Sequence, residues 1–551
     1  MITLLGFAAS QRDGSWDRVP LTDAACFYKT AYKIYYGMQD LGIGQFHLPW
    51  IYSDRVHAPL VPALSAFSML LFGPSKVAIE AVLPLFLFIF LFSTFVSAEI
   101  LYNRLTAFAV AGVVTTFPVV INLSRLYIFE LPFAALVVAA CACLLKSRGL
   151  LDLRWTLAFG VLSGLAALAR AGGPVLLAGP VIVYFIFSVR GARANHQLRL
   201  QMGRRIVSIM IAGGAAAVLA ATWYVPNWPH LNSYLASVTY GDLAPAFVQG
   251  SSPLAIANMM HYLEAIVVEG PGVPLLAIAV ICYFINNRTG RGGAKTSQVM
   301  LALALVFIIN YLILLIAAQR CGAVLFVSMM PILAAAGVRA VANMMNTFAR
   351  RAVAFLLAGY CIFQAVATTL FFPLPPDTDG GAGPFPVHFP LWSHRSMHLQ
   401  LAGVEFTDIR VRYPLEEIVD QIELLELPPK GRVYVMSAHP YANVNGIQFE
   451  AVRRKKDWEF KEGVLPVLVS SMTPAKWHSE IRTYALRSHA LVVKSTKDGD
   501  EATALYQIAI EPLVSGPNPF MARAAEPWEA SDGTVLTLYK RSAPAASAPP
   551  K

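Results

Sequence analysis

"VAIEAVLPLFLFIFLFSTFVSAE", residues 77–99, is a largely apolar run that is long enough to cross the hydrocarbon core of a bilayer as one helix. Across the whole chain of 551 residues, 56% of the side chains are hydrophobic and only 14% are charged. Soluble domains carry about 25% charged residues, so this composition excludes a water-soluble globule. The sequence therefore predicts an integral membrane protein.

Other apolar stretches of roughly spanning length surround this one and predict a multi-span helical domain over residues 1–371. They are residues 104–122, 127–145, 155–170, 174–189, 206–223, 271–286, 297–317, 322–338 and 352–371. The opening "MITLLGFAAS" (1–10) lacks the basic start and longer core of a signal peptide. We interpret it as a first span that is abbreviated or that begins upstream, which gives about eleven spans in total.

Lys and Arg gather in alternate connections between the spans, which predicts that these connections are cytoplasmic. They are Arg104; Lys146, Arg148 and Arg154; Arg190, Arg193, Arg199, Arg204 and Arg205; Arg288, Arg291 and Lys295; and Arg339, Arg350 and Arg351. Residues 11–76, 224–270 and everything after 372 are then expected outside. Segment 57–73 is expected to be a helix along the outer face, because counting it as a span would reverse this pattern. Topology thus accounts for most of the net charge of +10, and no nucleic-acid partner is expected.

The character of the chain changes after the last span. Residues 372–390 are rich in Pro and Gly and are expected to form a linker. Three β-type segments (431–437, 489–496 and 534–541) and a helical stretch (414–427) then predict a small soluble α/β domain over 391–541. Residues 437–450 are expected in a loop that follows a strand, and 542–551 in a disordered tail.

The outer loop opens with a polar, aromatic helix, "LTDAACFYKTAYKIYYG" (21–37). Its four tyrosines suit the boundary between membrane and water, where amphipathic rings are enriched. Asp23 stands at its start. An N-cap that accepts hydrogen bonds from the first turn and a catalytic base both need this position, and the two roles are compatible.

Further motifs follow this helix in a fixed order. They are "HAPL" (57–60), "TTFPVVINLSRLYIFELP" (115–132), "GVLSGLAALARAGGPVLLAGP" (160–180) and "QRCGAVLFVSMMPILAAAG" (319–337). As an ordered set they resemble the glycosyltransferase-C superfamily, in the branch of protein O-mannosyltransferases and bacterial aminoarabinose transferases. The resemblance covers roughly the first 190 residues well. His57 stands where the family more often has Lys, Glu130 where it usually has Asp, and Ala24 where some members carry a second acid.

The resemblance implies a multi-span α-helical membrane domain followed by a small soluble α/β domain. It also implies transfer of a sugar from a polyprenyl-phosphate-linked donor to a lipid, glycan or protein acceptor, with inversion. The expected location is a bacterial inner membrane with the C-terminal domain in the periplasm, in contact with membrane lipids.

The reaction needs a base for the acceptor proton and positive charge for the departing phosphate. Asp23 is the candidate base, and Glu130 is the candidate second acid that orients the acceptor or a basic partner. The outer-side cations that are candidates for gripping the phosphate are Arg125, Arg170 and Arg320. His57 is the candidate counterpart of the family's Lys, and Tyr28 is a candidate for lining the sugar pocket.

Each of these residues also has an ordinary structural reading. The three arginines equally suit snorkelling to the interface, and Glu130 suits the first turn of a helix. His57 is a common type of interfacial residue, and packing in the core suits Tyr28. Two carboxylates such as Asp23 and Glu130 are able to hold a divalent ion, although a monophosphate donor with several arginine partners does not require one.

Other classes of membrane protein remain as alternatives. A transporter or flippase of a lipid-linked substrate would be expected to place paired charges near the middle of its spans, whereas the acids here sit at the outer edge. A diverged, non-catalytic membrane scaffold would keep the same architecture. The six cysteines lie mainly in apolar segments, so neither a disulfide framework nor a metal-ligand motif is expected.

Overall fold

The computed structural model describes residues 22–170, 175–194, 201–239, 255–272, 275–278, 280–281, 294–316, 326–344, 347–370, 415–428, 430–436, 444–456, 458–462, 483, 487–496, 521–529 and 534–541. The chain divides into two compact units. Unit 1 comprises residues 1–10 and 37–397, and unit 2 comprises residues 11–36 and 398–551. The division falls inside helix α2 (Thr22–Leu41), whose residues up to 36 belong with unit 2.

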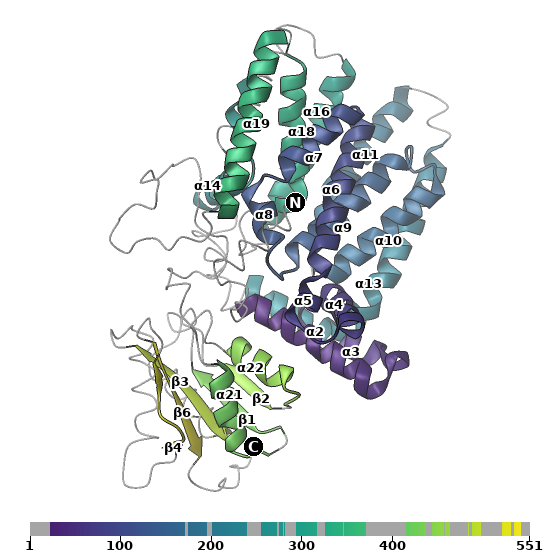
Figure 1. Ribbon diagram of the computed structural model, residues 1–551. Helices are drawn as coiled ribbons and strands as arrows, with labels where there is room; N and C mark the ends of the chain where they lie inside the picture. The colour runs from purple at the N-terminus through teal and green to yellow at the C-terminus, as the bar shows by residue number, and fades with distance from the viewer. Residues whose placement is uncertain are drawn as a thin grey trace. The chain divides into compact units, whose positions relative to one another are not determined.

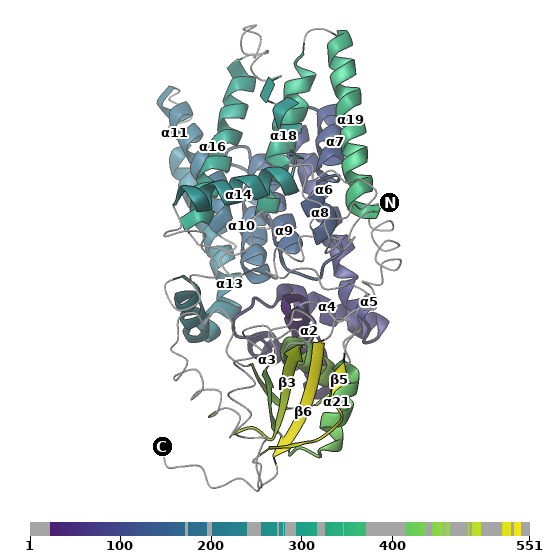
Figure 2. The same cartoon turned by 90° about the vertical axis from the view of Figure 1, so that its left-hand side faces the viewer.

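Unit 1 is helical wherever regular structure is described (Figure 1). Its elements after α2 are η1 (Ile43–Gln45), α3 (His47–Tyr52), α4 (Leu60–Phe72), α5 (Lys76–Glu80), α6 (Val82–Leu101), α7 (Arg104–Val114), α8 (Pro118–Leu123), α9 (Glu130–Lys146), α10 (Leu153–Ala169), α11 (Val175–Ala194), α13 (Met202–Thr239), α14 (Ile256–Glu269), α16 (Ala294–Ile316), η3 (Phe326–Met329), α18 (Met330–Ala342) and α19 (Thr347–Leu370). Helices α6, α9, α10 and α13 lie side by side in that order (Figures 1 and 2). Successive long apolar helices thus form a bundle, as their hydropathy predicts.

Several of these helices are long enough to span a membrane. Among the described residues, 3 helices are long and apolar enough to cross a bilayer: Lys76–Leu101, Met202–Ala236 and Thr347–Val366. Shorter apolar helices include Leu153–Ala169 and Val327–Ala342. The protein is therefore mostly helical with membrane-type helices, and the count of about eleven spans stays a prediction.

Small residues bring helices α10 and α13 into close contact. A Cβ atom at Gly160 would lie 2.3 Å from the carbonyl oxygen of Ala212, and one at Gly164 would lie 3.0 Å from that of Ala216. Spacings of four residues on both helices give the small-xxx-small pattern that lets membrane helices approach closely. Because the nearest atoms belong to the backbone, a larger residue at Gly160 would force the two helices apart.

The predicted span 104–122 is interrupted, which corrects the expectation of one continuous helix. Helix α7 ends at Val114, and α8 begins at Pro118. Phe117 has an extended backbone with φ −67° and ψ 129°, because the residue before a proline is disfavoured in the helical region. The hydroxyls of Thr115 and Thr116 donate to carbonyl oxygens of the last turn of α7, at 2.6 and 2.7 Å. Hydropathy alone did not register this break.

Helix α13 continues well beyond the predicted span 206–223. It reaches Thr239 and includes Pro226 and Pro229, so residues 224–239 are helical although they were expected in an outer connection. The prolines remove two backbone donors, but the helix retains side-chain bonds to a neighbouring segment. Asn227 Nδ2 donates to the carbonyl oxygen of Ile51 at 3.0 Å. Tertiary contact therefore extends the helix past the point where its hydropathy falls.

Segment 57–73 contains one short helix, as expected. Helix α4 has 13 residues and so a length of about 20 Å, which is less than the roughly 30 Å of a hydrocarbon core. Its side chains Val61, Ala66 and Met69 are fully buried. Ser65 Oγ donates to the carbonyl oxygen of Ile79 at 2.8 Å and accepts from Tyr127 Oη at 2.8 Å. Helix α4 thus packs against α5 and the connection before α9.

Basic connections gather at the opposite end of α6. Lys146 Nζ lies 4.5 Å from the centre of the Trp155 ring, where α9 connects to α10. The guanidinium of Arg339, in the last turn of α18, lies 5.3 Å from the ring of Tyr102, just beyond the end of α6. Lys146 and Arg339 therefore lie at the end of the described helices opposite α4, α5 and the connection before α9.

Unit 2 contains a mixed sheet in the order β2-β1-β3-β6-β4, with β5 also paired to β6. Its elements are α21 (Leu415–Leu424), β1 (Arg432–Met436), α22 (Val444–Arg453), β2 (Glu459–Glu462), β3 (Ala490–Thr496), β4 (Met521–Arg523), β5 (Trp528–Glu529) and β6 (Thr534–Arg541). Strand β1 runs parallel to β2 and β3, and β6 runs antiparallel to β3, β4 and β5. The three segments predicted as strands are β1, β3 and β6.

Helices cover this sheet through regularly spaced apolar residues. Helix α21 buries Leu415, Ile418 and Ile422 in one cluster with residues of β1, β3 and β6. Helix α22 corrects the prediction that residues 437–450 form a loop, because 444–453 are helical. Ile447 and Ala451, one turn apart, are both 0% exposed, and this apolar stripe stabilises the helix against the sheet.

Candidate functional site

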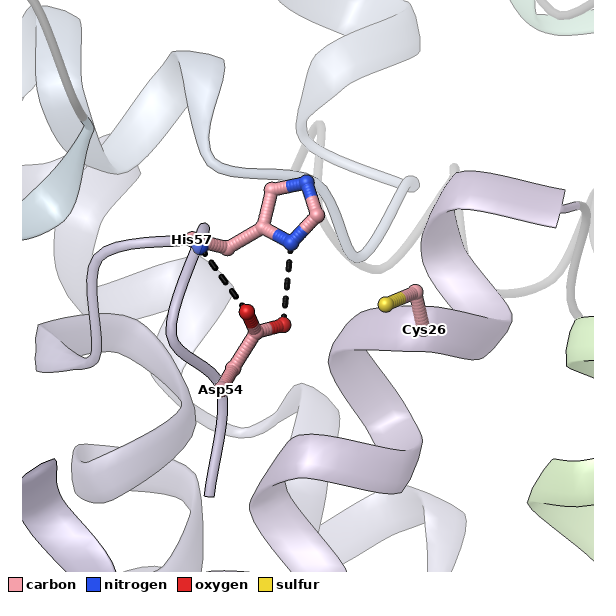
Figure 3. Close-up of side chains that lie close together, drawn as sticks. All are labelled: Cys26, Asp54 and His57. Atoms are coloured by element: carbon pink, nitrogen blue, oxygen red, sulfur yellow. Dashed lines mark hydrogen bonds and ion pairs between the residues drawn. The ribbon is translucent and has the colours of Figure 1, made fainter. Parts of the chain in front are cut away.

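His57 is held by a carboxylate that lies close before it in the sequence (Figure 3). Asp54 Oδ2 lies 2.9 Å from His57 Nδ1, and the residues are three positions apart. The other oxygen, Asp54 Oδ1, accepts from the backbone N–H groups of Val56 and His57, each at 2.9 Å. A single carboxylate thus fixes both the turn and the imidazole ring.

The electrostatics of this pair favour an ionised carboxylate. Burial raises the pKa of Asp54, but the neighbouring His57 and the two backbone N–H groups outweigh burial and hold it well below its usual range. An ionised carboxylate only accepts hydrogen bonds, so His57 Nδ1 carries a proton and donates it. The other ring nitrogen, Nε2, is on the side of the ring turned away from Asp54 (Figure 3).

Helix α13 fixes the segment that carries this pair. Trp223, which is 0% exposed, donates from Nε1 to the carbonyl oxygen of Asp54 at 3.2 Å. Arg55 Nη1 donates to Nε2 of His230 at 3.0 Å, and the rings of His57 and Tyr234 lie 6.3 Å apart. The part of α13 from Trp223 onward therefore holds residues 51–57 in place.

Glu130 and Arg170 form an ion pair between the first turn of α9 and the end of α10. Arg170 Nη1 donates to Glu130 Oε1. Glu130 is only 8% exposed, and its Oε2 is buried without a hydrogen-bond partner among the described residues. Of the three arginines that are candidates for phosphate binding, Arg170 is thus in contact with the candidate second acid. Arg125 lies half-buried in the connection between α8 and α9.

Asp23 lies in the first turn of α2, and its side chain falls outside the described residues. Further along this helix, Tyr28 is 2% exposed and its ring contacts Phe449 of α22 at 5.7 Å, edge to face. Lys29 Nζ donates to Gln448 Oε1 at 2.9 Å, and Tyr36 Oη donates to the carbonyl oxygen of Arg453 at 2.8 Å. Tyr28 therefore packs against α22, and its role in lining the sugar pocket stays a prediction.

Two further residues concern the comparison between the sequence prediction and the structure. Arg320 lies outside the described residues. Asp54, whose carboxylate contacts the ring of His57, was not predicted. The signal that would have found it is an acid three positions before the histidine in a polar outer segment, since Asp commonly accepts from backbone N–H groups two or three residues onward.

Comparisons with solved structures of ArnT support the fold. No family model and no curated protein matches the sequence. The solved structure of ArnT from Cupriavidus metallidurans bound to undecaprenyl phosphate matches with a TM-score of 0.54 at 12% identity, covering 98% of this chain and 96% of that chain. Apo ArnT gives a TM-score of 0.52 at 13% identity over 95% and 94% of the two chains. The apo oligosaccharyltransferase of Archaeoglobus fulgidus gives 0.49 at 11% identity over 90% and 69%.

The chain has the glycosyltransferase-C fold. The match extends through nearly the whole length of both chains, beyond the first 190 residues whose motifs carry the resemblance. At this identity the likeness speaks for the fold alone, so a reaction follows from it only as a proposal.

Proposed function

We propose that this protein is a membrane glycosyltransferase that moves a sugar from a polyprenyl-phosphate-linked donor to an acceptor hydroxyl or phosphate, with inversion. The observation that carries the proposal is the fold shared with ArnT, whose solved structure holds undecaprenyl phosphate. The ordered motifs from Asp23 to Arg320 support it independently, because they were identified from the sequence alone. The acceptor hydroxyl belongs to a lipid, a glycan or a protein.

Asp23 acts as the general base in this reaction. It takes the proton of the acceptor hydroxyl while the acceptor oxygen forms a bond to the anomeric carbon. The bond from that carbon to the phosphate oxygen breaks, and polyprenyl phosphate leaves with the electron pair. Positive charge from Arg125, Arg320 and His57 stabilises the departing phosphate.

Glu130 and Arg170 act together in the proposed site. Their contact supports a role in which Arg170 orients Glu130 and balances its charge, since a buried carboxylate is costly without a cation. The Oε2 atom of Glu130 then provides an acceptor for the substrate hydroxyl. In this arrangement phosphate binding falls mainly to the other two arginines.

Reaction on the extracytoplasmic face of a bacterial inner membrane is part of the proposal. The position of Lys146 and Arg339 at the end of unit 1 opposite α4 and α5 supports it, because Lys and Arg are enriched in cytoplasmic connections. The soluble α/β domain after the linker would then be periplasmic. A transporter fits less well, because the charged residues of α6, α9 and α10 lie near the helix ends.

The test is sugar transfer in membranes that contain the full-length protein and a labelled polyprenyl-phosphate sugar. Asp23→Asn is expected to abolish transfer while the protein remains folded and binds the donor, because Asn is unable to accept the proton. Asp40→Asn is the matched control, since Asp40 is an exposed carboxylate near the other end of the same helix. Full activity in Asp23→Asn would exclude Asp23 as the base.

A further inference from the structure

The segment that carries His57, residues 51–57, is bonded to helix α13 at two of its carbonyl groups. Helix α13 holds the carbonyl oxygens of Ile51 and Asp54 through the side chains of Asn227 and Trp223. Within the segment, both oxygens of Asp54 are used, one by the backbone and one by the imidazole. The side chain of His57 is 36% exposed and that of Asp54 only 12%. The acid is therefore enclosed, and the imidazole is the member of the pair that reaches outward.

Because Asp54 accepts from Nδ1, the charge of the imidazole ring decides whether Nε2 is a hydrogen-bond donor or an acceptor. With Nδ1 donating to Asp54, Nε2 of a neutral ring would be an unprotonated hydrogen-bond acceptor. In an imidazolium, Nε2 carries a proton and is a positively charged donor. The negative charge of Asp54 favours the imidazolium. A phosphate needs a donor with positive charge, so the pairing suits an anion at Nε2.

We propose that Asp54 is a positioning residue that holds His57 as an oriented imidazolium, so that His57 Nε2–H donates to the phosphate of the lipid-linked sugar. This inference rests on the proposed function and deepens it. It explains how a histidine serves at a position where the family more often has lysine, which is cationic without a partner. His57 touches the substrate, and Asp54 acts through His57.

Asparagine at position 54 separates this role from a merely structural one. Asn keeps a carbonyl oxygen that accepts from the N–H groups of Val56 and His57, so the turn is retained. Its NH₂ group would then face Nδ1 and donate to it, which leaves the ring neutral. Asp54→Asn therefore removes the charge of His57 while it preserves the backbone contacts.

The experiment compares the full-length wild type with Asp54→Asn, His57→Lys and the double variant, and measures kcat and KM for a labelled polyprenyl-phosphate sugar. Asp54→Asn is expected to lower kcat/KM by about 10–100-fold, mainly through KM, because a charged hydrogen bond to the donor is lost. His57→Lys supplies a charged group that needs no partner, and its own kcat/KM is the reference for the double variant. In the lysine background Asp54→Asn should change kcat/KM by less than about 3-fold, since a lysine needs no partner to be charged.

An equal loss in both backgrounds would overturn the proposal, because Asp54 would then act only on the shape of the segment. Unchanged kinetics in Asp54→Asn would overturn it as well. The ¹⁵N chemical shifts of the His57 ring in wild type and Asp54→Asn give a readout that does not depend on turnover. If the wild type transfers no sugar, the proposed function fails, while a ring that is imidazolium in the wild type and neutral in Asp54→Asn would still support the pairing.

Discussion

Removal of Arg170 is expected to destabilise the protein more than removal of Arg170 and the charge of Glu130 together. Arg170→Ala leaves the Glu130 carboxylate, 8% exposed, without the cation it contacts. Breaking a buried pair on one side costs about 3–5 kcal/mol. The two side chains retain 20% and 10% exposure, so the lower end, about 3 kcal/mol, is expected. Adding Glu130→Gln removes the stranded charge and should recover at least half of the loss.

Thermal unfolding in nanodiscs, followed by tryptophan fluorescence, measures this difference. Arg170→Ala should lower the midpoint by on the order of 3–4 °C, and the double variant by clearly less. Arg154→Ala is the control, because Arg154 is an exposed arginine near the start of the same helix. An Arg170→Ala midpoint equal to that of the control, combined with a raised KM for the donor, would refute the pairing argument and make Arg170 a phosphate ligand.

Three further perturbations test other parts of the structure. Phe449→Ala removes two ring contacts to α2, at 5.7 and 6.0 Å, which together contribute about 1–3 kcal/mol. Amides of α2 should therefore exchange hydrogen about 5–150-fold faster. Phe449→Leu keeps an apolar side chain and should have a smaller effect. Gly160→Ala should cost about 1–3 kcal/mol in thermal unfolding, whereas Gly213→Ala, which meets nothing within 4 Å, should be neutral or stabilising. Because the folded-state pKa of Asp54 is lowered, its carboxylate stabilises the fold above the unfolded-state pKa of about 4 and loses this effect as the pH falls further. The stability gap between wild type and Asp54→Asn should therefore be largest near pH 7 and shrink in acid, and a constant gap would contradict the pairing.

Hydropathy predicted those helices whose ends coincide with changes in polarity. Predicted spans 127–145 and 155–170 match α9 (Glu130–Lys146) and α10 (Leu153–Ala169) closely. It failed where backbone chemistry or tertiary contact sets the end. Pro118 interrupts one apolar stretch, and the bonds made by Trp223 and Asn227 prolong α13 through a polar stretch with two prolines. The polarity of the side chains indicates whether a helix lies in lipid or in water, but it does not determine at which residue the helix ends.

The residues of the candidate site also differ in whether the local sequence could predict them. Residues that the family motifs mark, such as His57 and Glu130, could be found from local sequence, because the chemistry requires particular side chains at particular positions. Their partners could not be found in this way, because Arg170 reaches Glu130 from 40 positions away and Trp223 reaches Asp54 from 169. The first contact depends on how α9 packs against α10, and the second on the position of α13, which Gly160 and Gly164 bring close to α10. A larger side chain at Gly160 is therefore expected to shift α13, whose Trp223 and Asn227 hold residues 51–57, although it touches neither Asp54 nor His57.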